Sequence, residues 1–423
     1  MDSIIGQASV GDRILDWSDK LAEFSEPGWI EKGQLTVTYL TPSHLSCAKY
    51  LEDLMGTAGF DEVSRDAVGN VVGVYRSDQA NAPTLMTGSH YDTVRNGGKF
   101  DGRLGIFVPI ACVQQLVSES RRLPFHIEVI GFSEEEGQRF SATFLASGAL
   151  TGSFNPDWLN QLDRDGISMR QAMLDAGLPG ELSAIHALKR DPSQYLGFVE
   201  VHIEQGPVLF EKELPLGVVT SINAGVRATC RITGRAEHAG TTPMQMRQDA
   251  LLAAAEISLM AEKRALADGD SVATVGQMNV SGGSINVVPG QCDFTLDMRA
   301  PTNPQRDLLV ADILHEAQLI ADRRQVTFDH QIVMKASAAP SDSGLQTRWE
   351  KAVQLLNIPL FKLNSGAGHD AMKLHEIMPQ AMLFVRGGNR GISHNPLEII
   401  SADDADLAVK AFLLFLNDLS DNK

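Results

Sequence analysis

The stretch that decides the fold is TLMTGSHYDTVRNGGKFDGRLGIFVPIACVQQL, residues 84–116. Its start, 84–89, is an apolar run that predicts a buried strand, and this strand runs into His90. A glycine-containing turn then carries Asp101, and residues 104–118 are apolar on most sides, which predicts a buried helix. A strand, a polar turn and a helix in this order are typical of an α/β sheet.

The same alternation continues on both sides of this stretch. It predicts strands at 71–75, 126–132, 197–204 and 381–385, and helices at about 42–58, 343–356 and 403–418. Thr41 is expected to cap the first of these helices, with Pro42 in its first position. We therefore expect an α/β fold with a mixed, mainly parallel sheet and helices on both faces.

Between residues 216 and 332 the pattern changes. It predicts strands at 218–223, 227–233, 272–280 and 293–298, with long helices at about 246–267 and 304–324. Strand, strand, helix, strand, strand, helix is typical of a small α+β sandwich. The prediction is one discontinuous α/β domain of residues 1–215 and 333–423, with a second, α+β domain of residues 216–332 inserted into it.

The composition restricts the class of protein. The chain has 423 residues, 43% of them hydrophobic and 21% charged, so it can bury a sizeable core. Its 36 basic and 53 acidic residues give a net charge of -17, which argues against nonspecific binding to nucleic acid or to anionic membranes. No apolar run approaches the ~18 residues that span a bilayer. The start, MDSIIGQASV, lacks the basic and apolar segments of a secretory signal, so we expect a soluble, cytoplasmic protein.

The four cysteines lie far apart and form no CxxC pair; they are Cys47, Cys112, Cys230 and Cys292. This spacing indicates neither a thiolate zinc site nor a disulfide framework. We expect reduced cysteines in the core.

Histidines and carboxylates follow the predicted strands where each strand ends. Ligands gather at the carboxyl ends of strands in open α/β sheets, so five of these side chains are expected to share one place. They are His90, Asp101, Glu136, His202 and His394. Three imidazoles and two carboxylates without a thiolate suit two divalent cations such as Zn, Mn, Co or Ni. A neighbouring glutamate that binds no metal could then serve as the base for a water shared by the two metals.

Each of these residues also has an ordinary explanation when taken alone. His90 could be a hydrogen-bonded histidine at a strand end, and Glu134–Glu136 could be a solvated loop. His202 and His394 could be structural. The interpretation as a metal site depends on all five potential ligands lying next to predicted strand ends or glycine-rich loops.

A series of motifs along nearly the whole chain resembles the hydantoinase/carbamoylase branch of the M20 metallopeptidase-like amidohydrolases. They are GSHYDT (88–93), GGKFDG (97–102), FSEEEGQRF (132–140), HIEQGPVL (202–209), AEHAGTTPM (236–244), GGSINVVPG (282–290), DMR (297–299), GAGHDA (366–371) and GISHNPLE (391–398). In peptidase and deacylase relatives the position of His202 is usually acidic. HIEQG therefore favours the branch that acts on ureido acids.

The resemblance implies a di-metal catalytic domain that holds two divalent metal ions, with zinc in the first place and Mn, Co or Ni as alternatives. One metal would be held by His90 and His202, the other by Glu136 and His394, and Asp101 would bridge them.

The resemblance also implies the groups that carry the chemistry. Glu135 would be the general base and then the general acid, and Asp92 would orient the imidazole of His90. The inserted domain would form the interface of a homodimer and act as a mobile lid. In that domain His238 and Asn286 would stabilise the oxyanion, and Arg299 would bind the substrate carboxylate. The remaining residues of the substrate pocket would be Gln205, Gly368 and His369.

The expected activity is hydrolysis of the linear ureido C–N bond of an N-carbamoyl-L-amino acid or of allantoate, with release of ammonia and carbon dioxide. A β-ureidopropionase is an alternative substrate class. An M20-type aminopeptidase or deacylase would share the fold and the metals. A protein that binds a ligand without catalysis is the remaining alternative, and the complete set of ligands together with Glu135 counts against it.

Overall fold

The computed structural model describes residues 9–421, and most of the MDSIIGQASV segment used above lies outside this range. The chain divides into two units. The first unit comprises the chain up to Thr220, Ser341–Leu363 and the chain from Gly368 onward. The second unit comprises Ser221–Pro340 and Asn364–Ala367. Among the described residues, no helix has the length and apolarity needed to cross a membrane.

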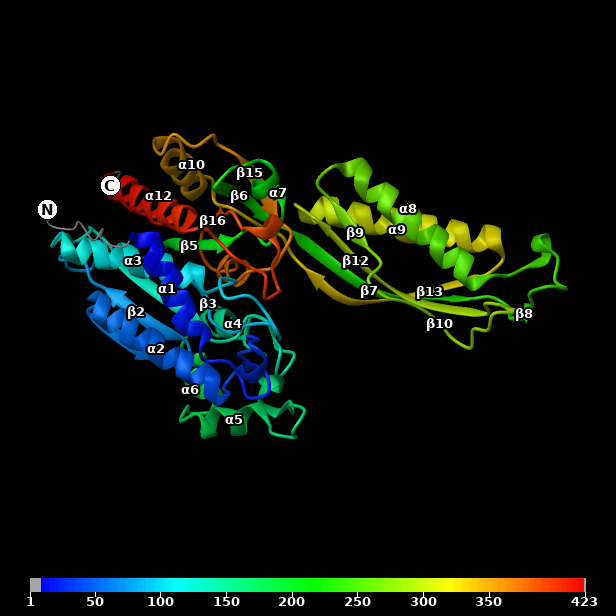
Figure 1. Cartoon of the computed structure of the whole chain (residues 1–423), viewed down its shortest axis with the longest axis horizontal. Helices are drawn as coiled ribbons and strands as arrows, with labels where there is room; N and C mark the ends of the chain where they lie inside the picture. Colours follow the sequence, from blue (N-terminus) through cyan, green and yellow to red (C-terminus); the bar gives the residue numbers. More distant parts are fainter. Residues whose placement is uncertain (1–8, 422–423) are drawn as a thin grey trace, which may run out of the picture. The chain divides into compact units, whose positions relative to one another are not determined.

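A nine-stranded mixed sheet forms the centre of the first unit (Figure 1). Its strands are β1 (Glu62–Arg65), β2 (Val71–Tyr75), β3 (Thr84–His90), β4 (His126–Phe132), β5 (Tyr195–Ile203), β6 (Leu216–Ile222), β14 (Ala339–Pro340), β15 (Lys362–Ser365) and β16 (Gln380–Val385). The strand order is β1-β2-β4-β3-β5-β16-β6-β14, and β15 also pairs with β6. The four central strands β4, β3, β5 and β16 are parallel, and the flanking strands pair antiparallel. The α/β fold with a mixed sheet is confirmed.

Helices pack on this sheet because its strands are apolar on both sides. The longer helices are α1 (Val10–Ala22), α2 (Pro42–Ala58), α3 (Leu104–Ser118), α10 (Ser343–Leu355) and α12 (Ala402–Asp421). The short helices are α4 (Leu145–Thr151), α5 (Met169–Asp175), α6 (Leu182–His186), α7 (Val208–Glu211) and α11 (Ala371–Leu374). Thr41 caps α2 and Pro42 opens it, as predicted.

Successive side chains of β16 and β5 point to opposite faces of the sheet, and this alternation determines which face carries the candidate site. Leu383 and Val201 belong to the core formed with the long helices. Phe384 and His202 occupy the adjacent positions, so they point to the opposite face, where α11 packs on both strands. The four cysteines are free and buried, which confirms the prediction of reduced core cysteines.

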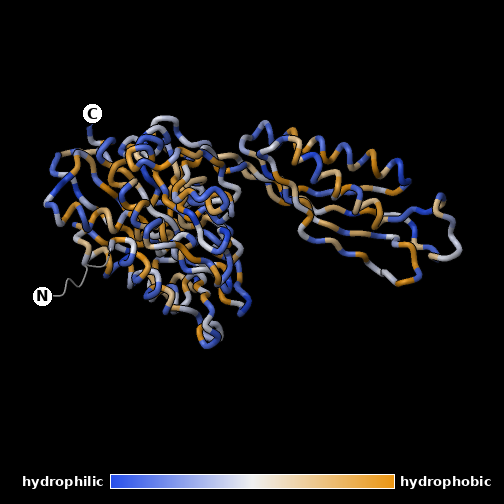
Figure 2. The backbone as a smooth tube through the Cα atoms, turned by 45° about the horizontal axis from the view of Figure 1, so that its top comes forward, coloured by the Kyte–Doolittle hydropathy of each residue, from blue (hydrophilic) through white to orange (hydrophobic). Residues whose placement is uncertain are grey.

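The second unit is a five-stranded antiparallel sheet with two long helices on one face (Figure 1). Its strands are β7 (Ala224–Thr233), β9 (Val272–Thr274), β10 (Met278–Val280), β12 (Gln291–Ala300) and β13 (Thr327–Ala336). The helices are α8 (Ala250–Asp268) and α9 (Asn303–Arg324), and a ribbon of β8 (Glu237–His238) and β11 (Val287–Val288) extends the unit. The backbone of α8 and α9 alternates between apolar and polar segments, as expected for helices with one buried side (Figure 2).

Two sequence-based expectations about this region were wrong, and one strand was not predicted. The strand predicted at 272–280 is two short strands, β9 and β10, separated by a segment that contains Gly276. The strand predicted at 218–223 is β6, which belongs to the nine-stranded sheet. The edge strand β13 was missed because most of its side chains are exposed, so its sequence lacks the apolar alternation of a half-buried strand.

Candidate functional site

Five side chains converge at the carboxyl ends of the central strands. His90 ends β3, Asp101 lies in the turn before α3, Glu136 follows β4, His202 lies on β5, and His394 follows the short 3-10 helix η5 (Asn389–Gly391). These are the five residues that the sequence placed together, and the structure brings them together around the carboxylate of Asp101.

Three imidazole nitrogens face the Asp101 carboxylate. Its Oδ1 lies 3.4 Å from Nε2 of His202 and 3.9 Å from Nε2 of His90, and its Oδ2 lies 3.1 Å from Nε2 of His394. The same nitrogen of His394 lies 3.4 Å from Oε1 of Glu136. Among the described residues there are four groups of three possible ligands whose ligand atoms lie within 4.8 Å of one another. Two of them are His90, Asp101 and His202, and Asp101, Glu136 and His394. Asp101 belongs to both groups.

The other ring nitrogens of two histidines contact oxygen acceptors. Nδ1 of His202 lies 2.9 Å from the carbonyl oxygen of Ile203, and Nδ1 of His90 lies 3.1 Å from that of Asp92. Because a carbonyl oxygen only accepts, each Nδ1 carries a proton, and Nε2 of a neutral ring keeps its lone pair toward Asp101. The backbone N–H of Gly102 donates to Nε2 of His202 at 3.1 Å, which agrees with this tautomer. Burial lowers the pKa of His202 to about 4, so this ring is neutral at physiological pH.

Asp92 joins the end of β3 to the loop after β4. Its carboxylate lies 3.3 Å from Nδ1 of His90 and accepts the backbone N–H groups of Glu135 at 3.2 Å and Glu136 at 3.1 Å. A carboxylate behind a ligating histidine is the arrangement that metal sites use to orient the ring. The position of Asp92 is therefore the one that its predicted role requires.

The site concentrates buried negative charge. Burial raises the pKa of Glu135 well above its usual value, and the Glu136 carboxylate raises it further. Burial and the nearby Asp92 raise the pKa of Glu134 in the same way. Hydrogen bonds to Asp101 and Glu136 raise the pKa of His394 to about 10. Carboxylates and imidazoles in such a place fit first-row divalent cations, which would replace the protons on the imidazoles and compensate the negative charge.

Two of the predicted pocket residues of the first unit contact this centre directly. The Gln205 amide donates to Oδ1 of Asp101 at 3.0 Å, and its backbone has a positive φ of 56°. His369 is only 2% exposed and packs behind His202, with ring centroids 4.4 Å apart. Gly368 lies so close to Phe144 that a Cβ at this position would come within 2.7 Å of the phenyl ring.

The other predicted residues lie in the second unit, in two separate places. His238 on β8 pairs with Val287, and the backbone N–H of Ala239 donates to the Asn286 carbonyl at 2.9 Å, so His238 and Asn286 are neighbours. Arg299 lies near the end of β12, where it forms an ion pair with Asp297. The structure brings His238 and Asn286 together and keeps Arg299 apart from them.

Sequence reasoning missed Glu398, which connects two loops of the site. This buried carboxylate accepts the backbone N–H groups of Phe100 at 2.8 Å and Asp101 at 3.0 Å, and the hydroxyl of Ser393 at 2.7 Å. It therefore ties the turn of Asp101 to the loop of His394. Glu398 lies inside the quoted GISHNPLE motif, but nothing in its local pattern distinguishes it from a surface glutamate.

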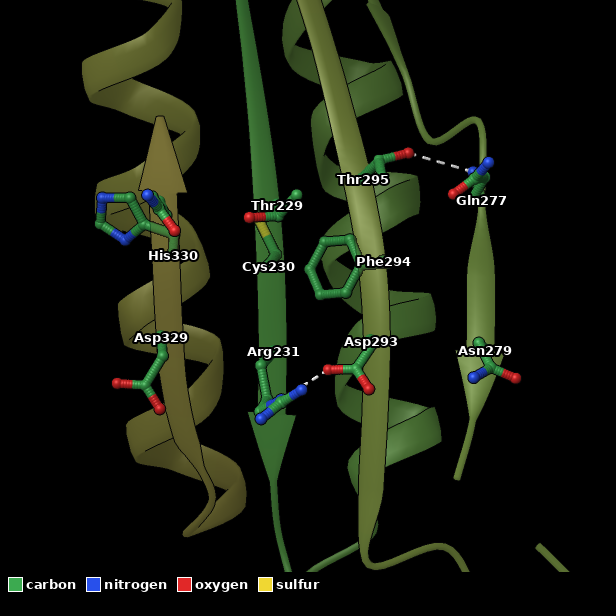
Figure 3. A pocket seen from close by; sticks show the side chains of 11 residues that line it. Thr229, Cys230, Arg231, Gln277, Asn279, Asp293, Phe294, Thr295, Asp329 and His330 are labelled. Carbon is green, nitrogen blue, oxygen red and sulfur yellow. Dashed lines mark hydrogen bonds and ion pairs between the residues drawn. The ribbon is translucent and has the colours of Figure 1, made fainter. Parts of the chain in front are cut away.

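The open face of the second sheet carries two hollows. One of about 700 Å³ is lined by polar side chains of β7, β12 and β13 and includes the ion pair of Arg231 and Asp293, whose Nε–Oδ1 distance is 2.6 Å (Figure 3). The other, of about 610 Å³, includes Arg299 and Asp297.

Three comparisons connect the chain to known proteins. The family model for Peptidase family M20/M25/M40 matches residues 86–418. The N-carbamoyl-L-amino acid amidohydrolase of Geobacillus stearothermophilus is 36% identical over 405 residues, which cover 96% of this chain and 97% of that protein. The allantoate deiminase of Arabidopsis thaliana is 35% identical over 411 residues, which cover 90% of this chain and 77% of that protein. A crystal structure of a hydantoinase/carbamoylase family amidase from Burkholderia multivorans matches with a TM-score of 0.90 at 28% identity, covering 97% of this chain and 98% of that chain.

Proposed function

The chain belongs to Peptidase family M20/M25/M40 and is a hydrolase of non-peptide carbon–nitrogen bonds, and we propose that it cleaves the linear ureido C–N bond of an N-carbamoyl-L-amino acid or of allantoate. The products would be ammonia, carbon dioxide and the corresponding amine. The observation that carries this proposal is the convergence of His90, Glu136, His202 and His394 around Asp101 in a chain so similar to ureido hydrolases.

In this proposal His90 and His202 would hold one divalent cation and Glu136 and His394 would hold the second, with Asp101 as the residue common to both groups. The pair would supply Lewis-acid polarisation of the ureido carbonyl and a water of lowered pKa. Zinc is the first candidate, and Mn, Co or Ni suit the same donors. The Nδ1 contacts of His90 and His202 described above leave Nε2 as the ligand atom of these two imidazoles.

Glu135 is proposed to move the proton. Its backbone N–H is held by Asp92, which fixes the residue beside Glu136. A carboxylate beside the metal ligands that itself binds no metal can take a proton from the attacking water and later deliver it to the leaving nitrogen.

His238 and Asn286 are proposed to donate hydrogen bonds to the oxyanion that forms at the ureido carbon. The backbone N–H of Gly240 donates to Nδ1 of His238 at 3.0 Å, so the neutral ring carries its proton on Nε2 and offers a donor. The Ser284 hydroxyl donates to Oδ1 of Asn286 at 3.0 Å, which leaves the amide N–H groups for a ligand. Donors fixed in this way stabilise developing negative charge.

We also propose that the second unit has the two roles expected of the inserted domain of residues 216–332. It would act as a lid and form the interface of a homodimer. Arg299 lies eight residues after Gln291 along β12, about 26 Å at 3.3 Å per residue. The ribbon with His238 continues from the Gln291 end of this strand, beyond the pairing of Gln291 with Thr233. One small ureido acid cannot reach both ends, so His238 and Arg299 of the same chain would serve different sites in a dimer.

The substrate is tested by measuring ammonia release from allantoate, N-carbamoyl-L-methionine and N-carbamoyl-β-alanine under identical conditions. Turnover of the first or second compound supports the proposal and selects between its two substrates. Turnover of N-carbamoyl-β-alanine alone identifies a β-ureidopropionase instead. Hydrolysis of a dipeptide or an N-acetyl amino acid, with none of the three ureido acids cleaved, contradicts the proposal.

A further inference from the structure

We propose that Asp297 is a positioning residue, which holds the guanidinium of Arg299 so that its two terminal nitrogens receive the substrate carboxylate end-on. The inference rests on the proposed function, since it takes Arg299 as the group that binds this carboxylate. It adds a residue to which the sequence assigned no role.

The contacts of Arg299 show which of its hydrogens remain for a ligand. Its Nε donates to Oδ1 of Asp297 at 2.8 Å, and its Nη2 donates to Oδ2 at 2.9 Å, so Asp297 takes the side of the guanidinium in a bidentate pair. Its Nη1 donates to the carbonyl oxygen of Gly366 at 2.6 Å. Three of the five N–H donors are therefore used, and one hydrogen remains on each terminal nitrogen. Those two can meet the two oxygens of a planar carboxylate.

The surroundings of the pair fit a binding role. The side chains of Arg299 and Asp297 are 27% and 29% exposed, and both line the hollow of about 610 Å³. Asp297 also accepts from Nε of Arg227 at 3.0 Å, so two guanidinium groups share one carboxylate. The cluster keeps a net positive charge, which attracts an anionic ligand. Arg is suited to binding a planar carboxylate, because its guanidinium is planar and has a fixed orientation once a partner such as Asp297 holds one edge.

The opposing explanation is that Asp297 and Arg299 form an ordinary ion pair on a strand and serve only stability. The same two strands offer a matched control for this explanation. Asp293 on β12 pairs with Arg231 on β7 at 2.6 Å, two residues beyond the Thr295 and Thr229 pair, and makes no contact with Arg299 (Figure 3). Asp293→Asn therefore removes a comparable surface ion pair without touching the proposed carboxylate site.

The test uses kinetics with N-carbamoyl-L-methionine and with its carboxamide, which lacks the negative charge. Asp297→Asn is expected to raise KM for the acid about tenfold to a hundredfold, the range for one charge-assisted contact, with kcat little changed. The carboxamide should bind equally to both proteins. Arg299→Gln should have the same phenotype, and the double variant should be no worse than Arg299→Gln, because Asp297 acts through Arg299. Asp293→Asn should match the wild type.

A binding measurement tests the role of Asp297 without relying on catalytic turnover. In a Glu135→Gln background, calorimetric titration with N-carbamoyl-L-methionine gives a Kd for the intact substrate, and adding Asp297→Asn should weaken it by the same factor. Wild-type affinity in the Asp297→Asn protein, or multiplied effects in the double variant, would overturn the inference while the proposed function stands. A wild-type protein that neither binds nor hydrolyses any ureido acid would overturn the proposed function and this inference with it.

Discussion

Asp101 is the residue on which the candidate site depends, because three imidazole Nε2 atoms face its carboxylate within 3.9 Å. The Nδ1 contacts of His90 and His202 with carbonyl oxygens turn the Nε2 atoms of these two rings toward Asp101. Asp92 lies behind His90 and contacts its Nδ1, and Glu135 is the residue proposed to move the proton.

Replacing Glu135 by Gln should separate metal binding from proton transfer. We expect the variant to retain its metal content and to lose about a hundredfold to ten-thousandfold in kcat, the range for loss of a general base. Glu136→Gln is the matched control, because it removes a proposed ligand and should lower metal content as well. Metal analysis and ammonia release on the same samples give both readouts, and a Glu135→Gln protein with normal kcat would exclude Glu135 from the reaction.

A second residue-scale prediction concerns the buried histidine of α2. His44 is fully buried, its Nε2 lies 2.7 Å from the carbonyl oxygen of Ser133, and burial lowers its pKa to about 4. The unfolded chain has an ordinary pKa near ~6.5, so it binds a proton first as the pH falls. Above pH ~6.5 the burial of His44 therefore does not change the free energy of unfolding. As the pH falls from ~6.5 to 4, this free energy should decrease by up to about 3 kcal/mol.

The measurement is urea unfolding of the wild type and of His44→Gln between pH 7.5 and 4, with chelator present throughout so that metal binding does not contribute. The variant keeps a polar side chain but cannot titrate, so its unfolding free energy should depend less on pH. Equal pH dependence in the two proteins would show that His44 is not buried in its neutral form.

At the scale of elements, the candidate site is formed by loops that follow different strands. Glu398 forms hydrogen bonds to two of these loops, that of Asp101 and that of His394. It holds the backbone of Phe100 and Asp101 before α3 and the Ser393 hydroxyl near His394. Losing such a contact behind the ligands should let Asp101 and His394 move apart.

We therefore expect Glu398→Gln to weaken metal binding about tenfold to a hundredfold, as loss of a supporting contact does in metal sites. Asp163→Asn is the control, since Asp163 accepts the backbone N–H groups of Asp165 and Ile167 in another turn of the first unit. A competition titration with a chromogenic chelator measures both affinities. Unchanged affinity in Glu398→Gln, with the control also unchanged, would show that the loops are fixed by other contacts.

The five converging residues could be predicted because strand ends are visible in the sequence as apolar runs that stop at His90, at Glu134–Glu136 and after His202. Parallel strands bring such ends to one edge, so topology alone places the ligands together. The contacts of Glu398 and Asp297 could not be predicted in this way, because each depends on loops or strands whose pairing the sequence does not reveal. β13 escaped for a related reason, since an exposed edge strand has no apolar periodicity.

At the scale of the whole molecule, the chain combines two units with separate cores. The alternation of predicted helices and strands changed character near the ends of the second unit, so its existence could be predicted. The positions of His238 and Arg299 within this unit could not be predicted. Both residues lie in recognisable motifs, but the sequence does not reveal that the fold places them toward opposite ends of β12.

This separation leads to a prediction about assembly. Mixing His238→Ala with Glu135→Gln chains under conditions that exchange subunits should restore about a quarter of wild-type activity, because half of the dimers are mixed and each mixed dimer has one intact site. Each variant alone is the control and should stay inactive. A mixture as inactive as its components would place His238 and Glu135 of one chain in the same site.

The central claim, a ureido hydrolase that depends on two metal ions, is tested most directly by titrating the chelated protein with Zn or Mn and following ammonia release from N-carbamoyl-L-methionine and allantoate. The account predicts no release from the metal-free protein, a rise with added metal, and a plateau at two equivalents per chain. Undiminished ammonia release from protein shown to be metal-free would contradict it, as would a fully metal-loaded protein that releases no ammonia from either compound.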